Sequence, residues 1–360
     1  MIKNIMRKKI KVLRIIGTID PARGGPSKTV IETSIVLNRK GFKVDILTAN
    51  KKGSNFFKSK EIRVINKGSM LNNEYGLSLS LFLWLLRNRN EYDYFIIHGV
   101  WRFYTLAARI LLKKKYYVFI HGQLDPFFSE DFFKRILKQI YWVCFEKKNL
   151  LCANSILLTS EGEKQSLKKT FVNTDGIKKT ILRYGIIKPK INKKLILKKF
   201  YKKFLNFKNK NFYLFLGRFH EKKGCEILIE SVKKMGKHFK SSILLAGPMM
   251  GTPYEKKIKN LVQKYKLQEK IILSDMLSGD LKWGSIQASK AMVLSSHGEN
   301  FGISLAESLC LGKPVLTTDK VNIFKEILNF NAGYVAKNRI DSFIKKLKKY
   351  DNLNKIELKK

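Results

Sequence analysis

The sequence predicts an α/β protein with two domains, each built around a parallel sheet. Short apolar segments alternate with amphipathic helical segments along most of the chain, which is typical of a sheet covered by helices on both faces. The length of 360 residues also exceeds what one such domain usually needs. Between residues 186 and 210 the alternation gives way to a lysine-rich stretch without a clear period. We therefore expect two Rossmann-like domains that are joined near this stretch.

The expected boundaries follow from that interruption. Residues 1–190 are assigned to the first domain, 191–210 to a linker and 211–345 to the second domain. Residues 346–360 form a lysine-rich tail.

In the first half, each predicted strand is a short apolar segment that is rich in β-branched or aromatic residues. The helix after the first strand stops at Gly41, where a glycine suits a helix end. Strands are expected at residues 11–17, 43–48, 61–66, 92–99 and 116–123, and helices at 30–41, 77–88 and 131–154. Residues 155–167 continue the rhythm with one more strand and helix.

The second half repeats the pattern. Strands are expected at residues 212–217, 241–247, 270–275, 290–296 and 313–318, with helices at 225–235, 254–265 and 303–312. Ligands of such folds bind beyond the carboxyl ends of the strands, so the loops that follow strands are the places to look for chemistry.

The charge balance is strongly basic, since 72 Lys and Arg residues oppose 28 Asp and Glu residues and leave a formal net charge of +44. Either this charge attracts an anionic partner, such as a membrane surface, a nucleic acid or a phosphorylated substrate, or it is a compositional bias that decorates solvated faces. The first residues lack the apolar region of a signal peptide, and the most apolar segment, 77–86, is too short to span a bilayer. We expect a cytoplasmic protein.

Two loops carry residues suited to an anion. Gly24 and Gly25 follow the first strand, where glycine lets the backbone approach a ligand and helix N–H groups favour an anion; an ordinary tight turn is the alternative. Arg218 directly follows a strand, and Lys223 precedes the start of a helix. Two cations in this position suit a diphosphate, unless they belong to a solvated basic loop.

A third loop, residues 297–302, leads into a helix and carries two acids. Glu299 lies in the loop and Glu307 in the helix, and carboxylates are the groups that accept hydrogen bonds from the hydroxyls of a sugar or a ribose. The alternative makes Glu299 a helix N-terminal charge stabiliser and Glu307 a surface residue. Because apolar residues flank Glu307, we expect its carboxylate to have a partner.

Together these loops resemble a known pattern. The segments GGPSKT, HGQLDP, GRFHEKKG, LLAGP and SSHGENFGISLAESLCLGKPV are similar to those of the retaining glycosyltransferases of family 4, which use nucleotide sugars. The last segment reproduces the E-x7-E pattern of that family, and the resemblance covers nearly the full length. It implies the GT-B fold, in which two Rossmann-like domains face each other across a cleft. In relatives a terminal helix crosses back to the first domain, and residues 346–360 are the candidates for it.

The resemblance implies a donor site in the second domain. Glu299 would contact hydroxyls of the transferred sugar and is one implied catalytic residue, while Glu307 would hold the ribose. The implied contacts to the donor diphosphate, two from side chains and two from the backbone, are Arg218, Lys223, Phe301 and Gly302.

In the first domain, the resemblance implies that His121 reaches the reacting carbon as the second catalytic residue. The loop at Gly24 and Gly25 would lie against the donor phosphate or the acceptor. Asp125 is a candidate acceptor contact, and His98 either lines the acceptor side or is a structural histidine.

The chain departs from the family at two places. Asn300 follows the first glutamate where many relatives have glycine, although a related subgroup also has asparagine. Arg183 and Tyr184 precede Gly185 where relatives often have Pro-Asn-Gly, so hinge contacts to the donor are not carried over.

The resemblance implies a hexosyltransferase that moves a hexose-type sugar from a UDP- or GDP-sugar to a hydroxyl of a saccharide or lipid-linked acceptor, with retention of configuration. The expected setting is the synthesis of cell-surface polysaccharide or lipopolysaccharide. The resemblance implies no cofactor and no metal, because cations and helix N-termini would neutralise the diphosphate, and no Asp-x-Asp motif occurs.

Aromatic and basic stretches at 82–89 and 125–142 would suit contact with anionic lipid at the inner face of the cytoplasmic membrane. The alternatives are another GT-B enzyme acting on nucleotide sugars, either an epimerase or a phosphorylase, and a basic nucleic-acid-binding protein without a recognisable motif.

Overall fold

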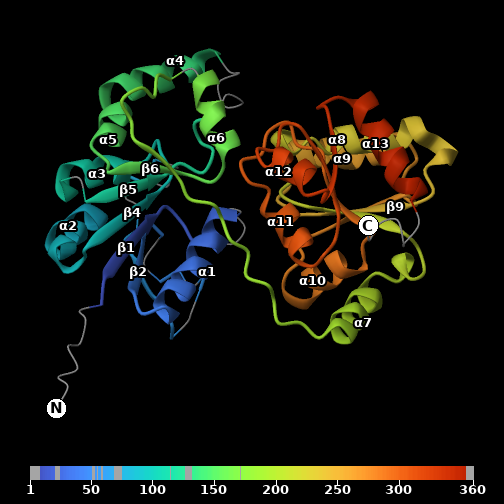
Figure 1. The fold of residues 1–360 in the computed structure, drawn as a ribbon, viewed down its shortest axis with the longest axis horizontal. Helices are drawn as coiled ribbons and strands as arrows, with labels where there is room; N and C mark the ends of the chain where they lie inside the picture. Colours follow the sequence, from blue (N-terminus) through green and yellow to red (C-terminus); the bar gives the residue numbers. More distant parts are fainter. Residues whose placement is uncertain are drawn as a thin grey trace. The chain divides into compact units, whose positions relative to one another are not determined.

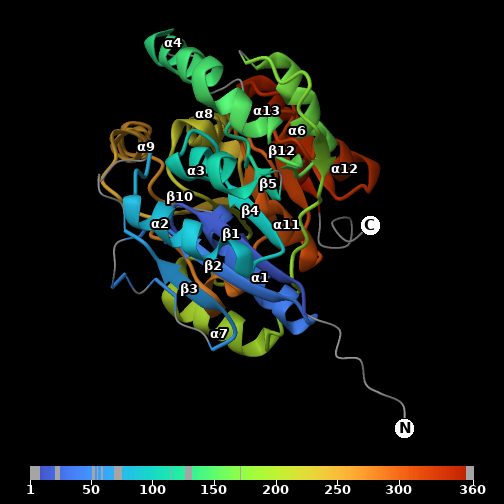
Figure 2. The same ribbon diagram turned by 90° about the vertical axis from the view of Figure 1, so that its left-hand side faces the viewer.

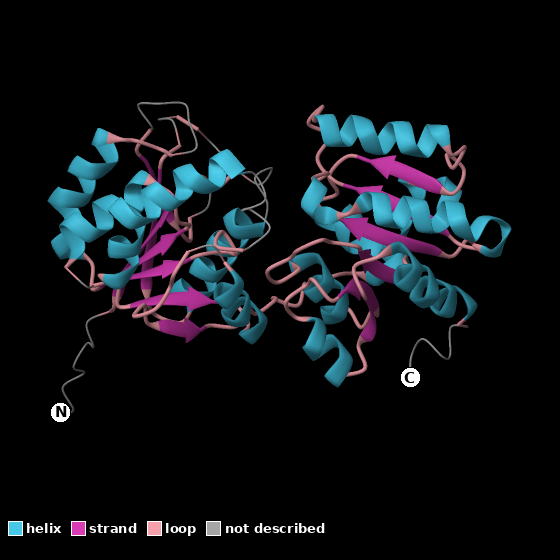
Figure 3. Cartoon of the chain, turned by 90° about the horizontal axis from the view of Figure 1, so that it is seen from above, coloured by secondary structure: helices cyan, strands magenta, loops and turns pink. Residues whose placement is uncertain are grey.

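The computed structural model describes residues 9–20, 25–50, 53–54, 56–57, 60–68, 75–113, 115–125, 132–170 and 172–353. The chain divides into two compact units, Met1–Arg183 and Tyr184–Lys360. Each unit has its own parallel sheet with helices packed around it (Figures 1 and 3). The predicted α/β class is therefore confirmed.

In the described part of the first unit, a seven-stranded parallel sheet has the order β3-β2-β1-β4-β5-β6-β7. Its strands are β1 (Lys11–Ile16), β2 (Lys43–Thr48), β3 (Arg63–Asn66), β4 (Tyr94–His98), β5 (Tyr116–Phe119), β6 (Ser155–Leu158) and β7 (Lys179–Ile181). Its helices are α1 (Gly25–Arg39), α2 (Leu79–Asn88), α3 (Phe103–Leu112), α4 (Phe132–Tyr141), α5 (Lys147–Leu151) and α6 (Glu161–Ser166). The order along the sheet reverses between β1 and β4, so the loops after these strands lie at a switch point.

The second unit, over the residues described, has a six-stranded parallel sheet in the order β10-β9-β8-β11-β12-β13. Its strands are β8 (Phe212–Leu216), β9 (Ser242–Ala246), β10 (Ile271–Ser274), β11 (Ala291–Leu294), β12 (Val315–Thr318) and β13 (Gly333–Ala336). Its helices are α7 (Lys193–Lys203), α8 (Cys225–Met235), α9 (Pro253–Lys264), α10 (Gly279–Ala288), α11 (Ile303–Cys310), α12 (Phe324–Asn329) and α13 (Ile340–Asn352). Here the order reverses between β8 and β11.

The two sheets account for the apolar segments of the sequence. Strands β6, β9, β11 and β12 are buried at every residue, as expected for strands covered on both faces. Each unit has its own apolar core, around Leu13, Phe95 and Tyr116 in the first and around Phe212, Phe215 and Phe343 in the second.

The segment 191–210, for which the sequence predicts a linker, instead contains α7. The side chain of Asn192 caps this helix by accepting the Leu195 N–H at 3.2 Å. Ile196 and Phe200, one helical turn apart, are buried against α10. Gly284 of α10 allows this contact, because a Cβ atom there would come within 2.4 Å of the Ile196 carbonyl oxygen. Only two side chains of α7 are buried, and its many lysines obscured the helical period in the sequence.

The helix predicted at 131–154 is interrupted. A π-helical turn, Trp142–Glu146, separates α4 from α5. Both end residues of this turn are buried, Trp142 at 1% exposure and Glu146 at 0%. The wider π-helical turn therefore places both its first and its last side chain inside the first unit.

The carboxyl-terminal tail is shorter than expected. Residues 346–352 complete α13, which packs beside α8 in the second unit (Figure 1). Phe343 and Leu347 of this helix are fully buried. Residues 354–360 lie outside the described residues.

The sequence also gave no sign of β13, the edge strand of the second sheet. Its first residue, Gly333, cannot carry a side chain, because a Cβ atom would lie 2.0 Å from the Val315 carbonyl oxygen.

None of the helices in the described residues is both long enough and apolar enough to cross a bilayer.

Candidate active site

The loops after β8 and β11 meet at the carboxyl edge of the second sheet, because these two strands are neighbours. The chain leaves β8 at Gly217, and Arg218 follows with an exposed side chain. A short 3-10 turn, Glu221–Lys223, then leads into α8. This edge lies at the reversal of the strand order, which is where such sheets bind ligands.

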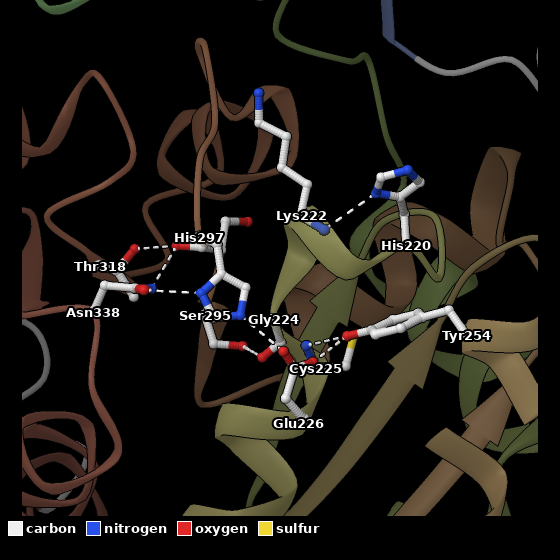
Figure 4. A network of polar contacts seen from close by, with 11 residues as sticks. His220, Lys222, Gly224, Cys225, Glu226, Tyr254, Ser295, His297, Thr318 and Asn338 are labelled. Carbon is white, nitrogen blue, oxygen red and sulfur yellow. Dashed lines mark hydrogen bonds and ion pairs between the residues drawn. The ribbon is translucent and has the colours of Figure 1, made fainter. Parts of the chain in front are cut away.

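Gly224 joins the two loops. Its φ of +60° lies in the left-handed region, and a Cβ atom there would come within 2.3 Å of the Ser295 carbonyl oxygen. Ser295 Oγ donates to the Gly224 carbonyl oxygen at 2.7 Å (Figure 4). His297 N–H donates to the Lys222 carbonyl oxygen at 2.9 Å. The main chain thus holds the loop after β8 against the loop after β11.

Lys223 and Glu299, assigned to the donor site from the sequence, form an ion pair between Nζ and Oε2, and both side chains are 19% exposed. Burial acts to raise the pKa of the Glu299 carboxyl. The charge and the hydrogen bond of Lys223, together with the charges of Lys222 and Arg218, outweigh burial and hold the pKa below its usual value. Glu299 is therefore an ionised carboxylate in a positive surrounding.

The main chain on both sides of Glu299 fixes its position. Its N–H donates to the Lys320 carbonyl oxygen at 3.0 Å, and its carbonyl oxygen accepts the Asn322 N–H at 2.9 Å. These bonds tie the loop after β11 to the loop after β12. The main chain that carries the Glu299 carboxylate is therefore held in place by hydrogen bonds on both sides.

Sequence reasoning missed a polar network around His297 in the same two loops (Figure 4). His297 Nε2 lies 2.8 Å from Glu226 Oε1, and His297 Nδ1 lies 2.8 Å from Asn338 Oδ1. The Tyr254 hydroxyl donates to Glu226 Oε2. Burial acts to raise the pKa of the Glu226 carboxyl, but the hydrogen bonds from His297 and Tyr254 hold it below its usual value. The available signal was the position of His297, two residues before the first glutamate of the E-x7-E pattern.

The second glutamate, Glu307, has the partner that its apolar flanks predict. Lys282 Nζ on α10 lies 2.8 Å from Glu307 Oε1, and the two side chains are 13% and 7% exposed. The same ammonium lies 3.9 Å from the centroid of the Trp283 ring. The predicted alternative of a surface residue is wrong for Glu307, because the side chain is buried. The sequence did not indicate Lys282.

Gly302 and Phe301 lie between the two glutamates. Gly302 has a φ of +72° and is the N-cap residue of α11, and a Cβ atom there would approach Leu305 Cδ1 to 3.2 Å. The half-buried Phe301 ring meets Tyr184 edge to face at 5.3 Å between centroids. Tyr184 is one of the residues at which the chain departs from the family pattern.

In the first unit, the ends of β1, β4 and β5 lie side by side. Ile16 of β1 pairs with His98 of β4, and His98 pairs with Phe119 of β5. His98 is buried and stacks on His121, with 5.2 Å between the ring centroids. This edge therefore brings together two histidines that are 23 positions apart in the sequence.

Arg14 determines which nitrogens of these histidines carry protons. Its Nε donates to His98 Nε2 at 3.1 Å, and His98 Nδ1 lies 2.9 Å from His121 Nε2. Because His98 Nε2 accepts, a neutral His98 carries its proton on Nδ1 and donates it to His121 Nε2. A neutral His121 then carries its own proton on Nδ1.

Both histidines are held neutral. Burial and then the Arg14 charge lower the pKa of His121 to about 3. Burial, followed by the charges of Arg14 and His121, holds the pKa of His98 well below its usual value. With both ring nitrogens engaged, His98 fits the structural alternative, and His121 is the histidine of the pair that is only half-buried.

The loop after β5 is braced by a buried carboxylate. Glu163 Oε1 accepts the Gly122 N–H at 2.9 Å, and Oε2 accepts the Thr159 N–H at 2.6 Å. His121 has a φ of +49°, a conformation that costs energy in any residue other than glycine. Asp125 is half-buried and donates its N–H to the Gly122 carbonyl oxygen at 3.0 Å.

The first loop is only partly described. Gly25 begins α1, whereas Gly24 lies outside the described residues. Within the part of the chain that the structure describes, no three His, Cys, Asp or Glu side chains gather so as to hold a metal ion.

Comparison with protein families gives two matches. The model described as Glycosyltransferase Family 4 matches residues 23–180, and the model described as Glycosyl transferases group 1 matches residues 198–358. The two matches cover the two units of the structure almost completely.

Among curated proteins, the alpha-1,3/1,6-mannosyltransferase ALG2 of Kluyveromyces lactis is 21% identical over 357 residues, which cover 86% of this chain and 69% of that protein. The O-antigen chain mannosyltransferase RfbU of Salmonella typhimurium is 26% identical over 257 residues, with 66% of each chain covered. The chain thus spans about two thirds of the length of both relatives.

Solved structures share the fold over nearly the whole chain. HepE of Anabaena in complex with UDP and glucose has a TM-score of 0.74 at 14% identity and covers 97% of this chain and 92% of its own. WaaG, a glycosyltransferase involved in lipopolysaccharide biosynthesis, has a TM-score of 0.72 at 16% identity, with 96% and 92% covered. With both units matched by glycosyltransferase models, the chain belongs to the family 4-like glycosyltransferases of the GT-B fold.

Proposed function

We propose that this glycosyltransferase moves a hexose-type sugar from a UDP- or GDP-sugar to a hydroxyl of a saccharide or lipid-linked acceptor, with retention of configuration. The reaction would serve the synthesis of cell-surface polysaccharide or lipopolysaccharide. The similar proteins ALG2 and RfbU are mannosyltransferases, so mannose is the first sugar to test.

The observation that carries the proposal is the cluster at the carboxyl edge of the second sheet. It holds the Lys223 ammonium against the Glu299 carboxylate, with the Arg218 charge close enough to act on that carboxylate. A nucleotide sugar needs both kinds of group at once, because its diphosphate is an anion and its sugar presents hydroxyls. Few small molecules other than nucleotide sugars combine these two demands in adjacent parts.

Lys223 can serve both parts of a nucleotide sugar, since it can bind the diphosphate and also hold the carboxylate that contacts the sugar hydroxyls. Its ammonium has three N–H donors, so it can keep a hydrogen bond to Glu299 while donating another to a diphosphate oxygen. Charge-assisted hydrogen bonds of this kind contribute about 1.5 to 3 kcal/mol each. As charge builds up on the leaving diphosphate, the interaction with Lys223 and Arg218 strengthens, which is the condition for lowering the barrier. Under this proposal no metal ion is required.

Glu307 would hold the ribose hydroxyls. Its Oε1 accepts a hydrogen bond from Lys282, and a carboxylate has the acceptor lone pairs that a ribose diol needs. The lysine then serves as the fixed counter-ion of this buried carboxylate.

In the first unit, His121 would contribute a neutral ring with its proton on Nδ1. Such a ring donates a hydrogen bond to a sugar hydroxyl without adding a positive charge.

We assign no protein nucleophile, so retention would come from attack on the face that the diphosphate leaves. The bond from the acceptor oxygen to the anomeric carbon forms as the bond from that carbon to the diphosphate oxygen breaks, and the proton of the acceptor hydroxyl passes to the departing diphosphate oxygen.

Nucleotide-dependent thermal stabilisation tests the donor site. A nucleotide at about a hundred times its Kd stabilises the protein by about 2.7 kcal/mol. UDP, GDP and ADP and their common sugar conjugates are compared on the wild type, Lys223→Ala and Lys256→Ala; Lys256 is exposed on α9 and provides the same charge change elsewhere. One nucleotide should shift the wild type and Lys256→Ala but not Lys223→Ala. An absence of any shift in the wild type would overturn the proposed donor class.

Turnover tests the reaction itself. Glu299→Gln should lower the rate about a hundredfold or more with the donor that stabilises the protein, while the protein remains folded. The anomeric configuration of the product, read by NMR from the one-bond coupling at the anomeric carbon, decides retention. A product of inverted anomeric configuration would contradict the proposed attack on the face that the diphosphate leaves.

The site of action would be the inner face of the cytoplasmic membrane, where a lipid-linked acceptor is found. The formal net charge of +44 supports attraction to anionic lipid.

A further inference from the structure

We propose that α4 and the π-helical turn after it form the surface through which this protein docks on anionic lipid. Five large apolar side chains define this docking stripe: Phe133, Ile136, Leu137, Ile140 and Val143. Their exposed fractions range from 43% to 78%. The inference rests on the membrane contact in the proposed function and names the element that makes it.

The spacing of these residues makes the stripe continuous. Positions three, four and seven residues after the first share one face of an α-helix, and Val143 follows in the π-helical turn three residues after Ile140. A surface helix of a globular protein normally turns such a face toward its core, whereas here this face is the solvent-exposed one. Figures 1 and 2 both show α4 at the periphery of the first unit.

The opposite face anchors the helix. Trp142, nine residues after Phe133 and therefore on the opposite side, is 1% exposed and lies 6.0 Å from the Trp101 ring. Tyr141 packs edge to face on Tyr75, with 5.9 Å between centroids. Lys138 Nζ lies 5.9 Å above Trp101. The exposure of the stripe therefore does not come from a displaced helix, since the other face is already packed on the first unit.

The charge of the same segment favours an anionic occupant. Between residues 132 and 148 the sequence has five Lys or Arg residues and one acid, Glu146. Arg135 and Lys148 are exposed, whereas Glu146 is fully buried. An exposed apolar face on a segment with a surplus of solvated cations is the pattern of a helix that lies in a membrane interface with anionic headgroups.

A second copy of the chain is a weaker occupant. The chain carries a formal charge of +44, and two stripes brought face to face would also bring two strongly basic chains together. Anionic lipid neutralises this charge instead. The same reasoning predicts that the bound state requires both parts: apolar insertion and headgroup charge.

Vesicle flotation of the full-length protein tests the inference. Vesicles of phosphatidylcholine alone are compared with vesicles that contain about 30% phosphatidylglycerol. The wild type should float only with the anionic vesicles. Phe133→Ser with Leu137→Ser removes the two most exposed side chains of the stripe and should reduce the bound fraction about tenfold or more.

The control is Leu205→Ser with Phe330→Ser, which removes two equally exposed apolar side chains, 69% and 80% exposed, from the second unit. It should float like the wild type. Equal flotation of both double variants would overturn the inference, because binding would then depend on charge alone. Failure of the wild type to float would overturn it as well.

Two further readouts separate the outcomes. Sedimentation velocity without lipid detects self-association, and a dimer that Phe133→Ser with Leu137→Ser dissociates would replace lipid with a second copy as the occupant. Nucleotide-induced stabilisation of the same variant should remain at the wild-type level. If the double variant no longer floats but still binds nucleotide, the result supports the docking stripe independently of the donor site. If the wild type binds no nucleotide, the result contradicts the proposed function but not the docking stripe.

Discussion

Replacing Lys282 with methionine should destabilise the second unit much more than replacing Lys199 with methionine. Both lysines pair with an acid in a contact that involves α10: Lys282 with Glu307 at 2.8 Å and Lys199 with Asp280 at 2.6 Å. By distance alone the second pair is the tighter one. The order of the two effects is set instead by solvent, because the first pair is 13% and 7% exposed and the second is 50% and 43% exposed.

The magnitudes follow from burial. Removing one partner of a buried ion pair leaves an uncompensated charge and costs about 3 to 5 kcal/mol, and the remaining exposure of Lys282 puts this pair at about 3 kcal/mol. An exposed pair contributes about 0 to 1 kcal/mol. In a unit of this size 1 kcal/mol shifts the melting temperature by about 2 to 4 °C, so Lys282→Met should lower the transition of the second unit by about 6 to 12 °C and Lys199→Met by less than about 4 °C.

Differential scanning calorimetry, with denaturant unfolding as a second measure, supplies the comparison. Adding Glu307→Leu to Lys282→Met should recover most of the stability, because the unpaired carboxylate is then gone. Similar small shifts for both single variants would refute the reasoning, since they would show that water reaches Glu307 freely.

Three further predictions concern the glycines, the histidines and Glu146. Gly224→Ala should cost several kcal/mol and abolish nucleotide-induced stabilisation, because its Cβ would meet the Ser295 carbonyl oxygen at 2.3 Å; Gly236→Ala, with a φ of +50° and no atom within 4 Å, should cost only about 1 kcal/mol in the same denaturant assay. Arg14→Met should raise the pKa of His121 from about 3 and release its fixed tautomer, which nitrogen-15 NMR of the imidazoles detects; an unchanged tautomer would contradict the role of Arg14. Burial raises the pKa of Glu146 to about 8, so the folded state holds this proton more tightly than the unfolded state, and stability should fall as pH rises from about 4.5 through 8; Glu146→Gln should flatten that part of the profile in unfolding experiments between pH 5 and 9.

The sequence was informative where a local pattern is enough. Each loop that carries a candidate residue follows a strand, and glycine at positions such as 224 and 302 indicates turns that the structure contains. The apolar neighbours of Glu307 were enough to predict a partner for it. These predictions depend only on residues close together in the chain.

The identity of partners far apart in the chain was not predictable. Lys282 is one of many lysines, and nothing near it in the sequence distinguishes it from the solvated ones. The contact between His98 and His121 depends on the strand order, which places β4 beside β5. The seating of α7 on α10 depends on Gly284, more than 80 residues from the helix that needs it.

The position of α7 limits the freedom of the chain between the units. Residues 182–192 have no regular secondary structure, and from Asn192 onward the chain is anchored to α10 through Ile196 and Phe200. Tyr184, near the start of this segment, meets Phe301 edge to face, so the second unit holds the segment at both ends. A second proline next to Pro189 would restrict a segment that is already held, whereas the same proline inside α7 would break the helix and destabilise the second unit. Insertions at 185–191 would consequently lengthen a loop that begins and ends on the second unit, whereas insertions after Lys193 would interrupt α7.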